Sequence, residues 1–186
     1  MSFRDDIINS ALNWADPGQY KPTANELISF FTDSSTQQAP SQDDAQRSLD
    51  RLGTGCYIGG QVKHWCGIFA CSLAVNVGLN TLGWDLMSGQ IKGAEVQKKW
   101  GSSGIQPGDI AAIAAHSHHF IVTDVTRSDW NGQSVLLVDT VEGNMQGQFI
   151  KVNSKRASEI VAYYQIQRQL QQNVLSGLAL TETPID

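Results

Sequence analysis

Residues 65–78 read WCGIFACSLAVNVG, a run that is apolar on nearly every side. A helix with apolar side chains all round is buried, and a glycine commonly follows the last turn of a helix. The run therefore predicts a buried helix that stops at Gly78. It also divides the chain, because the segments before it have the patterns of helices and most segments after it have the patterns of strands.

The segment before this run predicts helices. Each has a polar side chain that can cap its first turn, followed by apolar residues at helical spacing. They are a helix capped by Ser2 and ended by Asp16-Pro17-Gly18, a helix capped by Thr23 with Glu26, and a helix from Ser41 through Leu49 and Leu52 to Gly53. Residues 33–43 are polar and predict an exposed loop. A further short helix is expected within 91–100, around Val96 and Trp100.

The segment after residue 108 predicts strands separated by Gly, Asn and Asp turns. The strand candidates are 109–114, 119–125, 134–141, 149–152 and 160–166. Helices first and strands later favour an α+β fold, with N-terminal helices packed on an antiparallel sheet. We expect one domain over 1–166, with its helical part at 1–52, and a C-terminal tail at 167–186.

The composition limits the classes of protein. The chain has 186 residues, of which 41% are hydrophobic and 17% charged, which suits one folded domain rather than a disordered chain. The net charge is -5 and no basic stripe is visible, so we expect no nucleic-acid partner and no anionic membrane surface. No apolar run reaches the length of a membrane-spanning helix. Acidic Asp5 and Asp6 stand where a signal peptide needs basic residues, so synthesis in the cytoplasm without a signal peptide is expected.

The cysteines point to a nucleophile. Cys56, Cys66 and Cys71 are too few and too closely spaced for a disulfide framework. Cys66 lies at the start of the predicted buried helix, where the helix dipole favours a thiolate. Cys71 is a better candidate for the core.

The histidines supply candidate bases. His116, His118 and His119 cluster before a predicted strand, and a histidine there can pair with Cys66. The imidazole needs an acceptor that orients it. Glu142 and Asn144 flank one residue, so an extended chain points both to the same face. A metal site at 116–119 is the weaker reading, because zinc-site spacings are missing, and no metal or cofactor is expected.

Four segments together resemble the CHAP family, the amidases and peptidases of the papain-like cysteine hydrolases that cut bacterial peptidoglycan. In family order they are Trp65-Cys66-Gly67-Ile68-Phe69, Gln106-Pro107-Gly108-Asp109-Ile110, His119-Phe120-Ile121-Val122 and Val141-Glu142-Gly143-Asn144. The resemblance covers roughly residues 50–152. It implies a papain-like fold and cleavage of amide bonds in peptidoglycan.

The resemblance also implies roles for single residues. Cys66 would be the nucleophile, and His119 the base, because the apolar Phe120 follows it as the family pattern requires. His118 is the alternative base, since the family has one histidine where this chain has two. Glu142 or Asn144 would orient the imidazole. Gln61 is a candidate side-chain donor to the oxyanion.

Three functions remain open on the sequence. The first is a peptidoglycan amidase or endopeptidase, either an antibacterial effector delivered by a secretion system or a phage lysin released by lysis. Delivery to competing cells would imply an immunity protein in the producer. The second is a papain-like protease, deamidase or acyltransferase that acts on proteins. The third is a non-enzymatic papain-like or metal-binding module.

Overall fold

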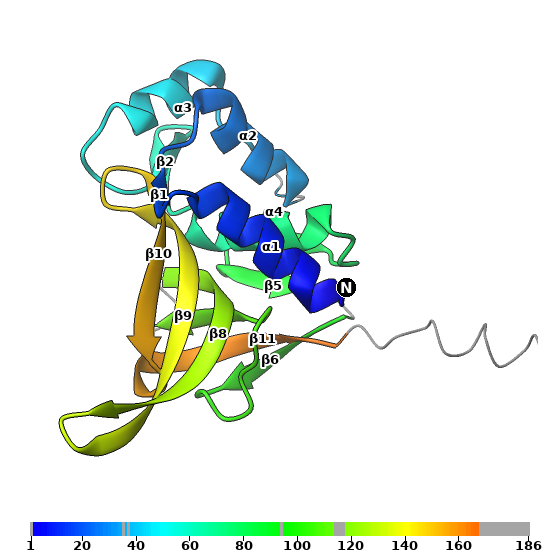
Figure 1. Cartoon of the computed structure of the whole chain (residues 1–186). Coiled ribbons are helices and arrows are strands. Elements are labelled where there is room, and N and C mark those ends of the chain that lie inside the picture. The colour runs from blue at the N-terminus through cyan, green and yellow to red at the C-terminus, as the bar shows by residue number, and fades with distance from the viewer. Residues whose placement is uncertain (1, 35, 37, 94, 114–117, 168–186) are drawn as a thin grey trace, which may run out of the picture.

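The computed structural model describes residues 2–34, 36, 38–93, 95–113 and 118–167. These residues form a mixed α+β structure with a large antiparallel sheet and few helices. The helices gather on one side of the sheet, as Figure 1 shows. The expected α+β class, with helices packed against an antiparallel sheet, is therefore confirmed.

The first helices begin where the sequence predicts, because their capping side chains are local. Helix α1 spans Phe3–Ala15 and α2 spans Ala24–Asp33, and each has a capping box, made by Ser2 with Asp5 and by Thr23 with Glu26. Helix α3 spans Gln42–Leu49 and is capped by Ser41. It ends at Leu49 instead of continuing through Leu52, whose side chain is exposed.

The predicted buried helix is α4, Cys66–Asn76. Its residues from Cys66 to Ala74 are all buried, and Gly78 after it has a positive φ of 98°. Helix α4 packs against α2 on one side and against strands of the sheet on the other. This central position explains why the run 65–78 is apolar all round.

Among the described residues, the large sheet has seven strands in the order β1-β10-β9-β8-β7-β11-β6, and neighbouring strands are antiparallel. The strands are β1 Gln19–Tyr20, β6 Val96–Trp100, β7 Ile110–Ile113, β8 His118–Trp130, β9 Gln133–Met145, β10 Phe149–Arg156 and β11 Ile160–Ile166. The strand candidates after residue 108 are confirmed, and β8, β9 and β10 run longer than expected. A short 3₁₀ turn, Ala157–Glu159, joins β10 to β11.

The expected helix within 91–100 is wrong. Val96–Trp100 forms β6, which pairs with β11. Apolar residues four positions apart share a face in a helix and also in a strand, so the spacing of Val96 and Trp100 fits both. The hydrogen bonds of β11 decide between them.

Two small hairpins flank the start of α4. One joins β2, Cys56–Ile58, to β3, Gln61–Lys63, and the other joins β4, Gly83–Asp85, to β5, Gln90–Lys92. Neither hairpin was expected from the sequence. Their strands of three residues are too short to show an alternating pattern.

The sheet separates two apolar clusters. Ile121 and Tyr164 face the helices, whereas Phe120 and Tyr163, their neighbours in sequence, belong to a second cluster. Alternate residues of a strand point to opposite faces, so the same strands supply both cores.

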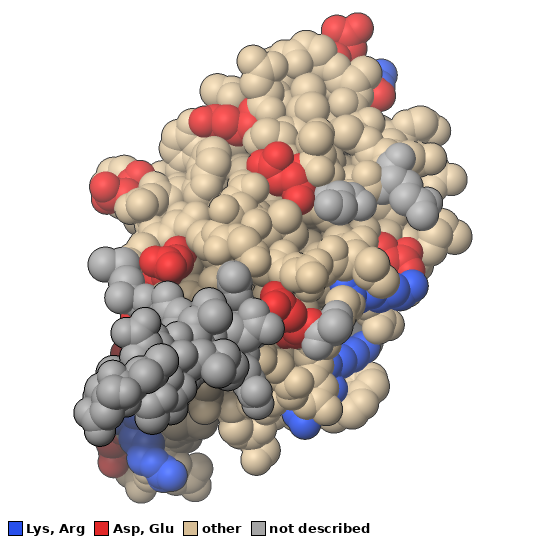
Figure 2. Space-filling model, turned by 90° about the vertical axis from the view of Figure 1, so that its right-hand side faces the viewer, with Lys and Arg blue, Asp and Glu red and all other residues tan. Residues whose placement is uncertain are grey.

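Figure 2 shows acidic side chains scattered over one face, with Lys and Arg mostly along its right-hand side and at its lower left. Among the residues that the structure describes, no helix combines the length and the apolar character needed to cross a membrane.

Candidate active site

Cys66 is the first residue of α4. The backbone enters the helix at Trp65, whose ring is fully buried, and this fixes the direction in which α4 starts. The N–H groups of a first helical turn point out of the helix end and favour negative charge there. A thiol in this position meets the electrostatic requirement for a nucleophile.

His118 begins β8 and contacts both chemical partners of the candidate site. Its Nε2 atom lies 2.8 Å from Oε2 of Glu142, and the side chain of Cys66 also favours the charged form of the ring. Burial alone would lower the pKa of His118, but the hydrogen bonds to Cys66 and Glu142 outweigh burial and raise it to about 9. The imidazolium form is therefore the stable one at neutral pH.

Glu142 is fully buried on β9, and three polar groups contact its carboxylate oxygens. Oε2 binds His118, while Oε1 accepts from the Thr140 hydroxyl at 2.8 Å and from Lys155 Nζ at 2.9 Å. Burial would raise the pKa of Glu142, but the bonds from His118, Lys155 and Thr140 lower it to about 2. Glu142 is thus a fixed negative charge beside the imidazole.

The register of the sheet brings His118 and Glu142 together. Ile121 of β8 pairs with Val141 of β9, so the start of β8 lies beside the end of β9. Residues of neighbouring strands on one face are within reach of each other.

His119, the sequence-based preference for the base, lines the cavity together with Cys66, whereas His118 is the histidine that binds Glu142. His119 is buried, with its ring edge-on to Trp84 at 4.8 Å between centroids and 6.1 Å from the ring of Tyr164. The preference rested on the apolar Phe120 after it. In the structure, the ring of His119 lies on the helix-facing side of the sheet and packs against Trp84. The histidine that binds Glu142 is His118, the alternative base of the sequence-based prediction.

Asn144 lies on β9 but does not take the expected place beside the imidazole of His118. Its Oδ1 accepts from the backbone N–H of Gly55 at 2.5 Å, and its Nδ2 lies 3.1 Å from Nδ1 of His64. Its φ of 60° is one that asparagine tolerates better than most residues. Asn144 therefore supports the segment that leads into Cys66.

Two supporting residues were missed in the sequence. Lys155 on β10 binds Glu142, although a lysine in a strand ordinarily indicates a solvated face. Gln148 is buried; its Oε1 accepts from Trp65 Nε1 at 2.8 Å, and its Nε2 donates to the carbonyls of Gly53 and Gly55. It lies in a Gly-rich turn, so no sequence signal distinguishes it from an ordinary turn residue.

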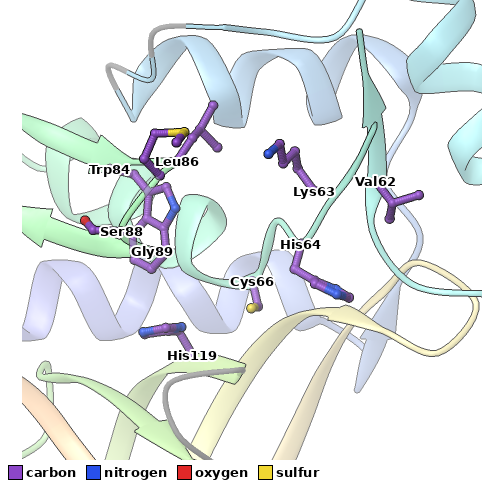
Figure 3. Close-up of a pocket in the computed structure, with 10 residues that line it drawn as sticks. Val62, Lys63, His64, Cys66, Trp84, Leu86, Ser88, Gly89 and His119 are labelled. Carbon is purple, nitrogen blue, oxygen red and sulfur yellow. The ribbon is translucent and has the colours of Figure 1, made fainter. Parts of the chain in front are cut away.

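A cavity of about 300 Å³ opens beside Cys66. Its lining residues come from both hairpins, the start of α4 and the start of β8: Val62, Lys63, His64, Cys66, Trp84, Leu86, Met87, Ser88, Gly89 and His119. Figure 3 shows Cys66 between the segment after β3 that carries His64 and the strand that carries His119. Gln61 is exposed on β3 and lies outside this lining.

Gly67 explains how one wall of the cavity approaches the nucleophile. A Cβ atom on Gly67 would come within 2.0 Å of the Trp84 ring. Only glycine therefore lets the indole lie against the first turn of α4.

The other two thiols lie outside the cavity lining. All three cysteines are free and buried. Burial raises the pKa of Cys71 to about 12, and it also raises the pKa of Cys56. Neither lines the cavity, so their surroundings suit packing.

The described residues hold no group of three or more His, Cys, Asp or Glu side chains that could bind a metal ion. His116, part of the weaker metal reading, lies outside the described residues, as does the tail from residue 168.

Comparison with family models, with curated proteins and with solved structures finds no match to this chain. The candidate site therefore rests on its own geometry and on the motifs of the sequence.

Proposed function

We propose that this protein is a cysteine hydrolase that cleaves amide bonds in bacterial peptidoglycan, with a papain-like fold. The observation that carries the proposal is the position of His118, which binds Glu142 and interacts with Cys66, while Cys66 lines an open cavity. A nucleophile, a base and an acceptor that orients the base are the parts that thiol hydrolysis requires. The substrate class rests on the four ordered motifs that resemble the CHAP family.

The mechanism begins with a proton on His118 and a thiolate on Cys66. The sulfur attacks the amide carbonyl carbon, a C–S bond forms, and the carbonyl π electrons move to oxygen. When the oxyanion collapses, the C–N bond breaks and His118 donates its proton to the leaving amine. Water then hydrolyses the thioester, with His118 as the base, and regenerates the thiolate and the imidazolium.

Glu142 keeps the imidazole in position through both steps. Because its charge is held by Lys155 and Thr140, it also stabilises the imidazolium between turnovers. This role needs a carboxylate that stays ionised, which agrees with its lowered pKa.

The cavity suits a short peptide better than a bulky folded surface. Trp84 and Leu86 form apolar lining, while Lys63 and Ser88 offer polar contacts. A peptidoglycan stem peptide has small apolar side chains as well as carboxylates, and both kinds of contact are present. The function is either that of an antibacterial effector with a cognate immunity protein or that of a phage lysin.

The test is digestion of purified sacculi by the full-length protein, with mass spectrometry of the released fragments. Fragments with a free stem-peptide amino terminus and intact glycan indicate an amidase, whereas cleaved stems or cross-bridges indicate an endopeptidase. Cys66→Ala should release nothing. Cys71→Ala, five residues away in the core, is the matched control and should remain active.

Intact sacculi after incubation with the folded wild-type protein would contradict the peptidoglycan assignment. Cys66-dependent cleavage or deamidation of proteins, in the absence of sacculus cleavage, would favour the alternative of an enzyme that acts on proteins. Equal loss of activity in Cys66→Ala and Cys71→Ala would contradict the choice of nucleophile.

A further inference from the structure

His64 stands two residues before Cys66 and lines the same cavity. His64 is exposed, and Figure 3 shows its ring projecting from the segment that leads into α4. The mechanism described above does not use it. Its neighbours nevertheless determine which ring nitrogen accepts a hydrogen bond.

The orientation of the Asn144 amide is fixed by a backbone group. The N–H of Gly55 can only donate, and it lies 2.5 Å from Oδ1 of Asn144. The oxygen of the amide must therefore face Gly55. Its nitrogen, a donor, consequently faces Nδ1 of His64 at 3.1 Å.

This contact fixes the tautomer of His64. A donor amide requires an acceptor, so Nδ1 of His64 must carry no proton. A neutral imidazole with a bare Nδ1 carries its proton on Nε2. The imidazolium form would instead set two N–H groups against each other. The Gly55–Asn144–His64 chain thus assigns Nδ1 as the acceptor and leaves Nε2–H as the donor of the ring.

We propose that His64 supplies, through Nε2–H, the side-chain hydrogen bond to the oxyanion that forms on attack by Cys66. The inference rests on the proposed function in that it needs Cys66 to attack a carbonyl. The backbone N–H of Cys66 at the helix start is the second donor. Asn144 is the positioning residue that fixes the His64 tautomer.

This assignment replaces Gln61 as the oxyanion donor. Gln61 is exposed on β3, opposite Ile58 in the hairpin, and does not line the cavity. His64 lies closer in sequence to the nucleophile and borders the space where the substrate carbonyl would lie.

The experiment uses the full-length protein with three substitutions at one position. Gln places its amide nitrogen where Nε2 of histidine lies, whereas Asn places its nitrogen near Nδ1, so His64→Gln can replace the donor and His64→Asn cannot. His64→Ala removes both nitrogens. Each variant is assayed for affinity toward N-acetyl-alaninal, a peptide aldehyde whose thiohemiacetal with Cys66 mimics the tetrahedral intermediate. Each is also assayed for the rate of Cys66 alkylation by iodoacetamide, which forms no oxyanion.

We expect His64→Ala and His64→Asn to lose at least about 10-fold in aldehyde affinity and about 10²-fold in turnover, with little change in alkylation rate. His64→Gln should recover most of both losses. Nitrogen-15 NMR of the wild-type imidazole should report the Nε2–H tautomer for His64. The unchanged alkylation rate shows that the fold and the Cys66–His118 pair survive the substitution.

Aldehyde affinity of His64→Ala equal to that of the wild type would overturn the inference, and so would an Nδ1–H tautomer or equal losses in the Gln and Asn variants. The aldehyde assay does not depend on the natural substrate. Wild-type protein that binds the aldehyde through His64 but leaves sacculi intact would therefore retain this inference and remove only the peptidoglycan assignment.

Discussion

Lys155 Nζ lies 2.9 Å from Oε1 of Glu142, and this ion pair is almost entirely buried. It joins β10 to β9 on the carboxylate that also binds His118. The cation compensates the burial of the carboxylate and leaves Oε2 free to orient the imidazole. A residue that looks like a surface lysine in the sequence is therefore part of the candidate site.

Lys155→Met should destabilise the protein by about 1–3 kcal/mol at neutral pH, because Glu142 loses a charged hydrogen-bond donor. A carboxyl group whose pKa is lower in the folded than in the unfolded protein stabilises the fold at pH values above its unfolded pKa. This stabilisation is lost as the pH falls through the folded pKa, which is about 2 for Glu142. The difference in unfolding free energy between wild type and variant should therefore shrink as pH falls from about 4.5 toward 2. Urea unfolding at several pH values measures it.

Lys151→Met on the same strand is the control, since its ammonium lies over the ring of Phe149 and not on Glu142. It should cost less stability and show no comparable dependence on acid pH. A pH-independent difference for Lys155→Met would argue against an ionised Glu142 as its partner.

The adjacent histidines should separate in mutant kinetics. His118→Ala should abolish turnover, because it removes the group that bridges Cys66 and Glu142. His119→Ala should instead lower stability, because its ring packs between Trp84 and Tyr164, and should leave turnover measurable. Sacculus digestion and urea unfolding of both variants distinguish the two roles. An inactive but stable His119→Ala with an active His118→Ala would reverse the assignment.

The rate of hydrolysis should decrease as pH rises through about 9, where His118 loses the proton that it donates to the leaving amine. A histidine with a raised pKa stabilises the fold below its ordinary pKa, and this contribution is lost as pH rises through the folded value. Stability should thus also decline between about pH 6.5 and 9. Alkylation of Cys66 needs no proton donor and should not decrease in this range.

Glu142→Gln should move the alkaline limit of hydrolysis to lower pH. The substitution removes a charge that raises the pKa of His118, while the amide keeps a similar shape. Glu159→Gln, an exposed carboxylate paired with Arg156, is the matched control and should leave the profile in place. An unshifted profile in Glu142→Gln would show that Glu142 does not set the protonation of His118.

Gly67→Ala tests the contact between α4 and the cavity wall. In an open helix, alanine is favoured over glycine by about 1 kcal/mol. Here the added Cβ meets the ring of Trp84, so the substitution should lower stability and weaken substrate binding. In a Trp84→Ala background the same change should raise stability instead. Urea unfolding of the wild type, the two single variants and the double variant gives the coupling free energy between positions 67 and 84. If Gly67→Ala raised stability in both the wild-type and the Trp84→Ala proteins, the contact would be contradicted.

The sequence alone determined the features that depend on neighbouring residues. Ser2 and Thr23 cap α1 and α2 through side chains three positions from their partners, so the pattern contains the whole interaction. The apolar run before Gly78 likewise identifies α4 as a buried helix, and turn residues separate the strands after it. Cys66 at a helix start and Glu142 near a strand end follow from these assignments.

Only the tertiary structure decided which histidine meets Cys66 and Glu142. His118 and His119 are adjacent and have the same side chain, and successive residues of a strand point to opposite faces of the sheet. Which histidine binds Glu142 therefore depends on the face of the sheet on which the Glu142 carboxylate lies. The partners lie 24 residues apart for His118 and Glu142, and 80 apart for Asn144 and His64. Long sequence separation also explains why the strand β6 and the roles of Lys155 and Gln148 could not be predicted. Their roles are set by hydrogen bonds to distant strands and loops, and sequence spacing does not encode such pairings because they form only when the sheet register is in place.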